Sequence, residues 1–147
     1  MKRRGDPLDG FLVLDKPVGP SSTQALGRAR RAMGAAKAGH CGTLDPLASG
    51  VLVIAFGEAT KLVDHVMDGA KRYAFEVAWG EERSTDDLEG EVVARSDLRP
   101  GREEILAALP AFIGTIEQVP PPYSAIKQDG VPAYRRARAG AAIGGHA

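Results

Sequence analysis

A glycine-rich run, residues 38–50, leads directly into the apolar segment 51–54. The run reads AGHCGTLDPLASG and contains one histidine and one carboxylate. A short apolar segment bounded by glycine is typical of a buried strand. A side chain at the mouth of such a strand is held by a rigid element beside whatever binds there. The pattern therefore predicts a loop in front of a buried strand, with Asp45 as a candidate reactive group.

Composition limits the size and the setting of the fold. With 147 residues, 44% of them hydrophobic and 26% charged, the chain can form one globular domain with a core, and it is short for two. Its single cysteine cannot form an internal disulfide, which favours a reducing cytoplasm. The basic residues 2–4 are not followed by the run of about 7 to 15 apolar residues that a signal peptide needs, and no run approaches the roughly 18 apolar residues that span a bilayer. The sequence therefore predicts a cytoplasmic protein that does not enter a membrane.

Charge is sorted along the chain, although the formal net charge is zero. Residues 1–75 contain 11 Lys and Arg against 7 Asp and Glu, residues 76–118 contain 4 against 11, and residues 119–147 contain 4 against 1. Zero net charge argues against an indiscriminate nucleic-acid binder. If the first and last segments fold against each other, they can present a basic face to phosphates. An ordinary mixed surface is the alternative.

Hydrophobic periodicity predicts strands and helices in irregular alternation. The expected strands comprise residues 10–15, 51–56, 71–79 and 113–119, with 91–95 as a partner strand after the acidic connection 80–90. The expected helices comprise residues 23–33, 58–67, 102–111 and 133–139. Ser21 or Ser22 can cap the first helix, and Gly34 ends it. This order favours an α+β fold, with a mixed, mainly antiparallel sheet and packed helices, over a doubly wound parallel sheet.

Each candidate residue of the glycine-rich run also has a structural interpretation. An Asp before a Pro commonly bonds a nearby backbone N–H in a turn, whereas a free carboxylate can act as nucleophile, base or metal ligand. Asp45 has no second acid or histidine at metal-ligand spacing, so the sequence predicts no metal. His40 can bond the loop or a substrate, or serve only the fold. Cys41 lacks the sequence context of a catalytic thiol.

Groups suited to RNA binding occur outside this run. Lys16 stands beside a Pro-Gly turn, where it can contact a phosphate or remain a solvated turn lysine. Tyr73 falls on the apolar face of its expected strand, a core position, but at the start of a strand its ring can stack on a base. Residues 134–138, YRRAR, interleave basic and aromatic groups as RNA-binding segments do.

Five blocks in order together resemble the TruB family of bacterial tRNA pseudouridine synthases. The blocks are GFLVLDKPVGPSS at 10–22, GHCGTLDPLASGVL at 39–52, GEATK at 57–61, KRY at 71–73 and PYSAIK at 122–127. The resemblance covers residues 9–140, and the block around Asp45 is highly specific.

The resemblance implies that the uridine at position 55 in the T loop of tRNA is isomerised to pseudouridine, with no cofactor or metal. Asp45 would be the nucleophile, adding either to the uracil ring or to the ribose. The target nucleotide would be flipped out of the loop, with the ring of Tyr73 stacked on its base. His40 would contact the RNA, and Lys16 would lie near the active site. The expected partner is the T arm of tRNA, and the expected state is a monomer.

The resemblance also implies a division of the chain. Residues 1–140 would form the N-terminal part of a catalytic domain, with 120–140 as an RNA-binding insertion and 141–147 as an irregular tail. Family members continue with strands that supply an arginine to pair with the nucleophile, and with a small C-terminal RNA-binding domain. We expect these parts to be absent here. Two alternatives to an enzyme therefore stay open: an RNA-binding or RNA-folding module without chemistry, and a truncated product.

Overall fold

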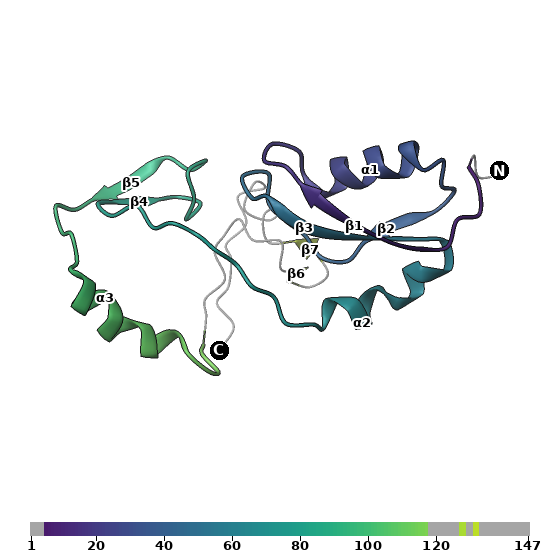
Figure 1. Cartoon of the computed structure of the whole chain (residues 1–147). Helices are drawn as coiled ribbons and strands as arrows, with labels where there is room; N and C mark the ends of the chain where they lie inside the picture. Colours follow the sequence, from purple (N-terminus) through teal and green to yellow (C-terminus); the bar gives the residue numbers. More distant parts are fainter. Residues whose placement is uncertain (1–4, 118–126, 129–130, 133–147) are drawn as a thin grey trace. The chain divides into compact units, whose positions relative to one another are not determined.

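The computed structural model describes residues 5–117, 127–128 and 131–132 (Figure 1). The chain divides into two compact units, Met1–Tyr73 and Ala74–Ala147, which are described separately here. Throughout the described ranges, every helix is too short or too polar to cross a membrane.

A three-stranded antiparallel sheet forms the centre of the first unit. Its strands are β1 (Gly10–Lys16), β2 (Ala38–His40) and β3 (Gly50–Phe56), in the order β1-β3-β2. The strands expected at 10–15 and 51–56 are thus confirmed. Residues 38–40, by contrast, were expected to be loop, and that prediction was wrong. They form a strand because the backbone groups along the free edge of β3 need hydrogen-bond partners, and residues 38–40 supply them, with Ala38 paired to Phe56.

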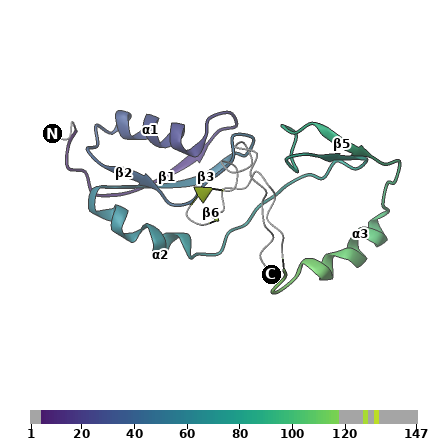
Figure 2. The same cartoon turned by 180° about the vertical axis from the view of Figure 1, so that it is seen from behind.

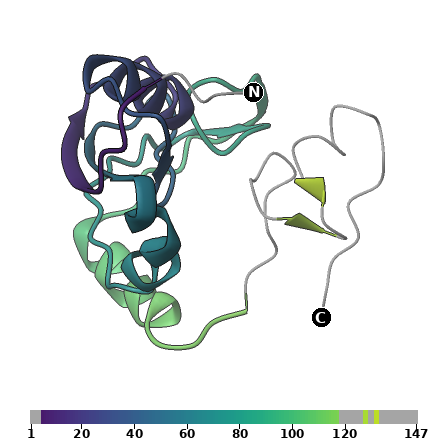
Figure 3. The same cartoon turned by 90° about the vertical axis from the view of Figure 1, so that its right-hand side faces the viewer.

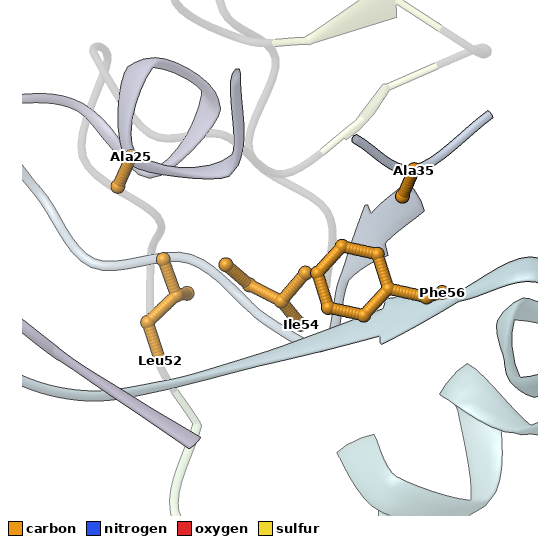
Figure 4. Packing of buried hydrophobic residues seen from close by; sticks show 5 residues of the cluster. All are labelled: Ala25, Ala35, Leu52, Ile54 and Phe56. Carbon is orange, nitrogen blue, oxygen red and sulfur yellow. The ribbon is translucent and has the colours of Figure 1, made fainter. Parts of the chain in front are cut away.

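Helix α1 (Ser22–Ala32) covers one face of this sheet and forms the core with it. The helix begins at the capping residue Ser21, whose Oγ accepts a hydrogen bond from the N–H of Gln24. Alternate residues of β3 point toward the helix, and Figure 4 shows their side chains beneath it. The buried hydrophobic cluster consists of Ala25, Ala35, Leu52, Ile54 and Phe56. The expected helix and its cap are therefore confirmed.

A 3₁₀ segment, η1 (Gly57–Leu62), and the short helix α2 (Val63–Met67) lie on the other side of the sheet. Figures 1, 2 and 3 show α1 and α2 on opposite sides of the sheet. One continuous α-helix was expected at 58–67, and the structure corrects this. The hydroxyl of Thr60 donates to the carbonyl oxygen of Gly57 at 2.7 Å, and such local side-chain bonds compete with regular helix formation.

The alternating segment 71–79 forms no strand, contrary to expectation. Its apolar side chains are exposed, including Phe75 at 82% and Val77 at 54%. A strand needs a neighbour to satisfy its backbone groups. Within the described residues this segment has no ladder partner, and alternation by itself does not supply one.

The first regular elements of the second unit are β4 (Glu81–Arg83) and β5 (Val92–Arg95), which form an antiparallel hairpin. The partner strand expected at 91–95 is confirmed, but it pairs with residues that were expected to be acidic connection. The carboxylate of Glu81 supports the pairing by accepting hydrogen bonds from Arg83 on its own strand and from Arg95 on the partner. Cross-strand pairs of opposite charge stabilise such ladders.

Helix α3 (Arg102–Ala108) and the 3₁₀ turn η2 (Leu109–Phe112) follow the hairpin. The helix ends earlier than the expected 102–111 because Pro110 cannot donate a backbone hydrogen bond. The strand expected at 113–119 is not formed over 113–117, and its last two residues lie outside the described ranges.

Two more strands, β6 (Lys127–Gln128) and β7 (Val131–Pro132), pair with each other near the end of the described chain. Neither was expected. The helix predicted at 133–139, the tail 141–147 and most of the insertion 120–140 lie outside the described residues. All ladders between the named strands are antiparallel. Together with the packed helices, this confirms the predicted α+β class.

Candidate active site

The loop that carries Asp45 follows His40 in the chain and is hydrogen-bonded to the turn after Lys16. Both β1 and β2 run antiparallel to β3, but only β1 extends to the residue where β3 begins, whereas His40, the last residue of β2, is paired with Ile54 further along β3. Lys16 is paired directly with Gly50, the first residue of β3. Residues 41–49, called the Asp45 loop below, connect β2 to β3. The topology therefore places Asp45 in a loop between β2 and β3, bonded to the turn that follows β1.

The Asp45 loop is attached to the start of α1 immediately before Asp45. The hydroxyl of Ser22 accepts a hydrogen bond from the N–H of Leu44 at 2.8 Å and donates one to the carbonyl oxygen of Leu44 at 2.9 Å. The side chain is well placed for this because Ser22 is the first residue of the helix and is 4% exposed. The backbone that enters Asp45 is therefore fixed by a helix.

The loop is attached again immediately after Asp45. The N–H of Gly19, in the turn after β1, donates to the carbonyl oxygen of Pro46 at 2.8 Å. Within the loop, the N–H of Ala48 donates to the carbonyl oxygen of Asp45 at 3.0 Å. The backbone is thus held on both sides of the candidate nucleophile.

The side chain of Asp45 is exposed. In the ranges that the structure describes, its carboxylate forms no hydrogen bond and no ion pair. An Asp before a Pro commonly accepts a hydrogen bond from a turn amide with its side chain, but Asp45 makes no such bond here. A fixed backbone that presents a free carboxylate suits a residue that acts on a ligand.

Lys16 lies inside the molecule rather than on the surface of its turn. Its side chain is completely buried, and its Nζ donates to the carbonyl oxygens of Pro17 and Pro20, both at 2.9 Å. The alternative of a solvated turn lysine is therefore wrong. Because the side chain is completely buried, a phosphate could reach Nζ only if the turn opened. In this position the ammonium group shapes the turn that contacts the Asp45 loop through Gly19.

His40, the last residue before the Asp45 loop, and Cys41, the first residue of that loop, differ in the contacts that they make. The Nδ1 atom of His40 is buried and has no hydrogen-bond partner among the described residues. The backbone N–H of Cys41 donates to the carbonyl oxygen of Val53 at 2.8 Å. Burial raises the pKa of the Cys41 thiol, so less of it is in the reactive thiolate form at neutral pH than for an ordinary cysteine.

Tyr73 is not joined to these residues by any hydrogen bond in the described ranges. It follows α2 in a segment without regular structure, and its side chain is 64% exposed. A core position is therefore not what this residue occupies. Its stacking on a base stays a prediction, and the basic segment 134–138 lies outside the described residues. In those described, no three His, Cys, Asp or Glu side chains lie close enough together to hold a metal ion.

Ser22 is the residue of this site that sequence reasoning missed. The sequence offered two adjacent serines as alternative helix caps, and the structure assigns the cap to Ser21. The second serine was thus left without a role. No local pattern could reveal that its partner, Leu44, stands 22 positions further along the chain.

Comparison with known proteins identifies a family. Residues 30–146 match the family model described as TruB family pseudouridylate synthase (N terminal domain). A curated tRNA pseudouridine synthase B of Bradyrhizobium diazoefficiens is 59% identical over 143 residues, which cover 97% of this chain and 41% of the relative. The protein of the same name from Rhodospirillum rubrum is 58% identical over 142 residues, with 97% and 46% covered.

Two solved structures are also similar in part. A chain in the crystal structure of a Cbf5-Nop10-Gar1 complex matches 37% of this chain, with 45% identity and a TM-score of 0.36, and 17% of that chain is covered. A chain of the archaeal box H/ACA sRNP Nop10-Cbf5 complex matches 42%, with 39% identity and a TM-score of 0.38, and 23% of it is covered.

The chain spans less than half the length of the curated relatives named here. The family model nevertheless matches most of the chain, including the Asp45 loop and all of β3. On that match, the chain belongs to the TruB family of pseudouridylate synthases, within the family's N-terminal domain.

Proposed function

We propose that this chain provides the nucleophile of a tRNA pseudouridine synthase, with Asp45 acting on the uridine at position 55 of the T loop. The observation that carries the proposal is the state of Asp45. Its carboxylate is exposed and unbonded within the described residues, while its loop is attached at Leu44 and at Pro46. The named relatives, tRNA pseudouridine synthases B, support tRNA as the substrate.

The reaction requires a nucleophile but consumes no second reactant. The bond between N1 of uracil and C1′ of ribose breaks, and a bond between C5 and C1′ forms. C5 loses its proton and N1 gains one, so the product has the same composition as the substrate. Asp45 can assist by adding to C1′ of the ribose or to the uracil ring, and it is released when the new bond forms.

The target base must leave the stack of the T loop before Asp45 can reach it. His40 opens the Asp45 loop and is suited to contact the RNA there. Tyr73 has an exposed ring that can stack on the extruded base. The basic segment 120–140 would then contact the T arm as an insertion. The proposed protein acts on tRNA as a monomer in the cytoplasm.

The test is pseudouridine formation in a T-arm stem-loop RNA incubated with the 147-residue chain. Asp45→Asn should abolish turnover and leave RNA binding largely intact. A matched control is Asp64→Asn, which removes another exposed carboxylate of the same unit, in α2. Because the Asp45 carboxylate is unbonded, Asp45→Asn should change the free energy of unfolding by less than about 0.5 kcal/mol.

Each result has a distinct meaning. Turnover that persists in Asp45→Asn would contradict the assigned nucleophile. RNA binding without turnover by the unsubstituted chain would identify an RNA-binding module instead of an enzyme. Absence of both would contradict the proposed function for this chain.

A further inference from the structure

The hydroxyl of Ser22 holds the two peptide groups on either side of the Leu44 side chain. Its oxygen accepts a hydrogen bond from the N–H of Leu44, in the peptide group between Thr43 and Leu44. Its O–H donates to the carbonyl oxygen of Leu44, in the peptide group between Leu44 and Asp45. A hydroxyl group can serve as donor and acceptor at once, which an aliphatic side chain cannot do. The contact therefore depends on the chemistry of this one residue.

Ser22 is available for this contact because its neighbour performs the capping. Ser21 accepts from the N–H of Gln24 at 3.2 Å, and its own N–H donates to the Gln24 side chain at 2.9 Å. Ser22 makes no capping bond and is anchored in the first turn of α1 with 4% exposure. A side chain in the first turn of a helix holds its partner more precisely than one on a loop.

We propose that Ser22 is the positioning residue for Asp45, fixing the direction from which the carboxylate meets its substrate. This inference rests on the proposed function. Without the hydroxyl, two polar backbone groups of Leu44 lose their partner in a partly buried place, where unpaired groups are costly. The Gly19 bond to Pro46 would still attach the other side of the loop. Loss of the Ser22 hydroxyl should therefore make the position of the Asp45 carboxylate less well defined, while the loop stays attached at Pro46.

The experiment compares Ser22→Ala with Ser21→Ala and Ser22→Thr in the full chain. Ser21→Ala is the matched control, because it weakens the same helix end and leaves the Leu44 contact in place. Ser22→Thr retains a hydroxyl. Amide hydrogen exchange, measured by NMR, reports the Leu44 N–H directly, and a single-turnover assay with the T-arm RNA reports the chemical step.

In Ser22→Ala, exchange of the Leu44 N–H should become about tenfold faster. The rate at saturating RNA should fall by about 10- to 100-fold, with the dissociation constant for RNA unchanged, because misplacement affects the reaction more than binding. Ser21→Ala should change neither the exchange rate of the Leu44 N–H nor the single-turnover rate appreciably. Recovery of both values in Ser22→Thr would support the role of the hydroxyl.

The inference is overturned if Leu44 exchange is unchanged in Ser22→Ala, or if exchange rises while the single-turnover rate stays that of the unsubstituted chain. It is also overturned if Ser21→Ala has the same effect on the rate. Rapid Leu44 exchange in the unsubstituted chain would overturn it without any variant. Inactivity of the unsubstituted chain would contradict the proposed function alone, and Leu44 exchange would still decide whether Ser22 fixes the loop.

Discussion

The ammonium group of Lys16 donates to the carbonyl oxygen of Pro20 across the turn that follows β1, at a distance of 2.9 Å. The side chain is completely buried, and the same Nζ also donates to the carbonyl oxygen of Pro17. A charged group is expensive to bury, and here two backbone carbonyl oxygens compensate part of the cost. The turn in question also provides Gly19, which bonds the Asp45 loop.

Replacing Lys16 should therefore destabilise the first unit. Lys16→Ala removes both hydrogen bonds and leaves a cavity, so the free energy of unfolding should fall by about 2 kcal/mol or more. Lys16→Met should cost less, because it retains most of the buried stem. Urea unfolding followed by circular dichroism measures both. Lys61→Ala is the control, since its exposed ion pair with Glu58 should hardly affect the midpoint. Equal stability of Lys16→Ala and the unsubstituted chain would contradict the assigned role.

Tyr73 should contribute to the reaction through its ring and not to the fold. Its side chain is 64% exposed, so Tyr73→Ala should leave thermal unfolding nearly unchanged. Lost stacking on the extruded base should slow pseudouridine formation by about tenfold. Tyr73→Phe keeps the ring and should retain most of the rate. Phe75→Ala, at a neighbouring exposed aromatic residue, serves as control. A rate unaffected by Tyr73→Ala would remove this residue from the proposed site.

Cys41 should react slowly with alkylating reagents in the folded protein. Burial raises the pKa of its thiol, so the reactive thiolate is scarcer at pH 7 than in the unfolded chain. The alkylation rate by iodoacetamide should rise with pH and should increase when urea unfolds the protein. Because the folded state retains the proton longer, this thiol also favours folding at low pH, and that contribution is lost as the pH rises through the folded-state pKa. Equal rates in folded and unfolded protein at pH 7 would contradict the partial burial of this thiol and its raised pKa.

Local sequence patterns predicted the elements whose own residues carry a strong apolar pattern. The apolar run 10–15, the periodic segment 23–33 with its serine cap, and the apolar run 51–56 all formed as expected. Each of them has an apolar run or a helical apolar stripe of its own that can be buried against the others. The same local information singled out Asp45, because glycine, carboxylate and apolar strand follow one another directly.

Local patterns were misleading where the presence or absence of a pairing strand, and not the segment's own residues, decides whether a strand forms. Residues 71–79 alternate as a strand does, yet no described segment pairs with them. Residues 38–40 have no strand pattern, yet they pair with β3. A ladder stabilises both of its strands through shared backbone bonds, so neither strand can be judged from its own residues.

The sequence by itself determined the family, the α+β class and the candidate nucleophile, because these depend on residue identity and spacing. Only the tertiary structure decided that Lys16 is buried in its turn and that Ser22, rather than a residue of the Asp45 loop, holds Leu44. Such contacts arise when folding brings distant backbone groups beside a side chain that can satisfy them. The sequence determines which hydrogen bonds each group is able to make, but the tertiary structure determines which group becomes its partner.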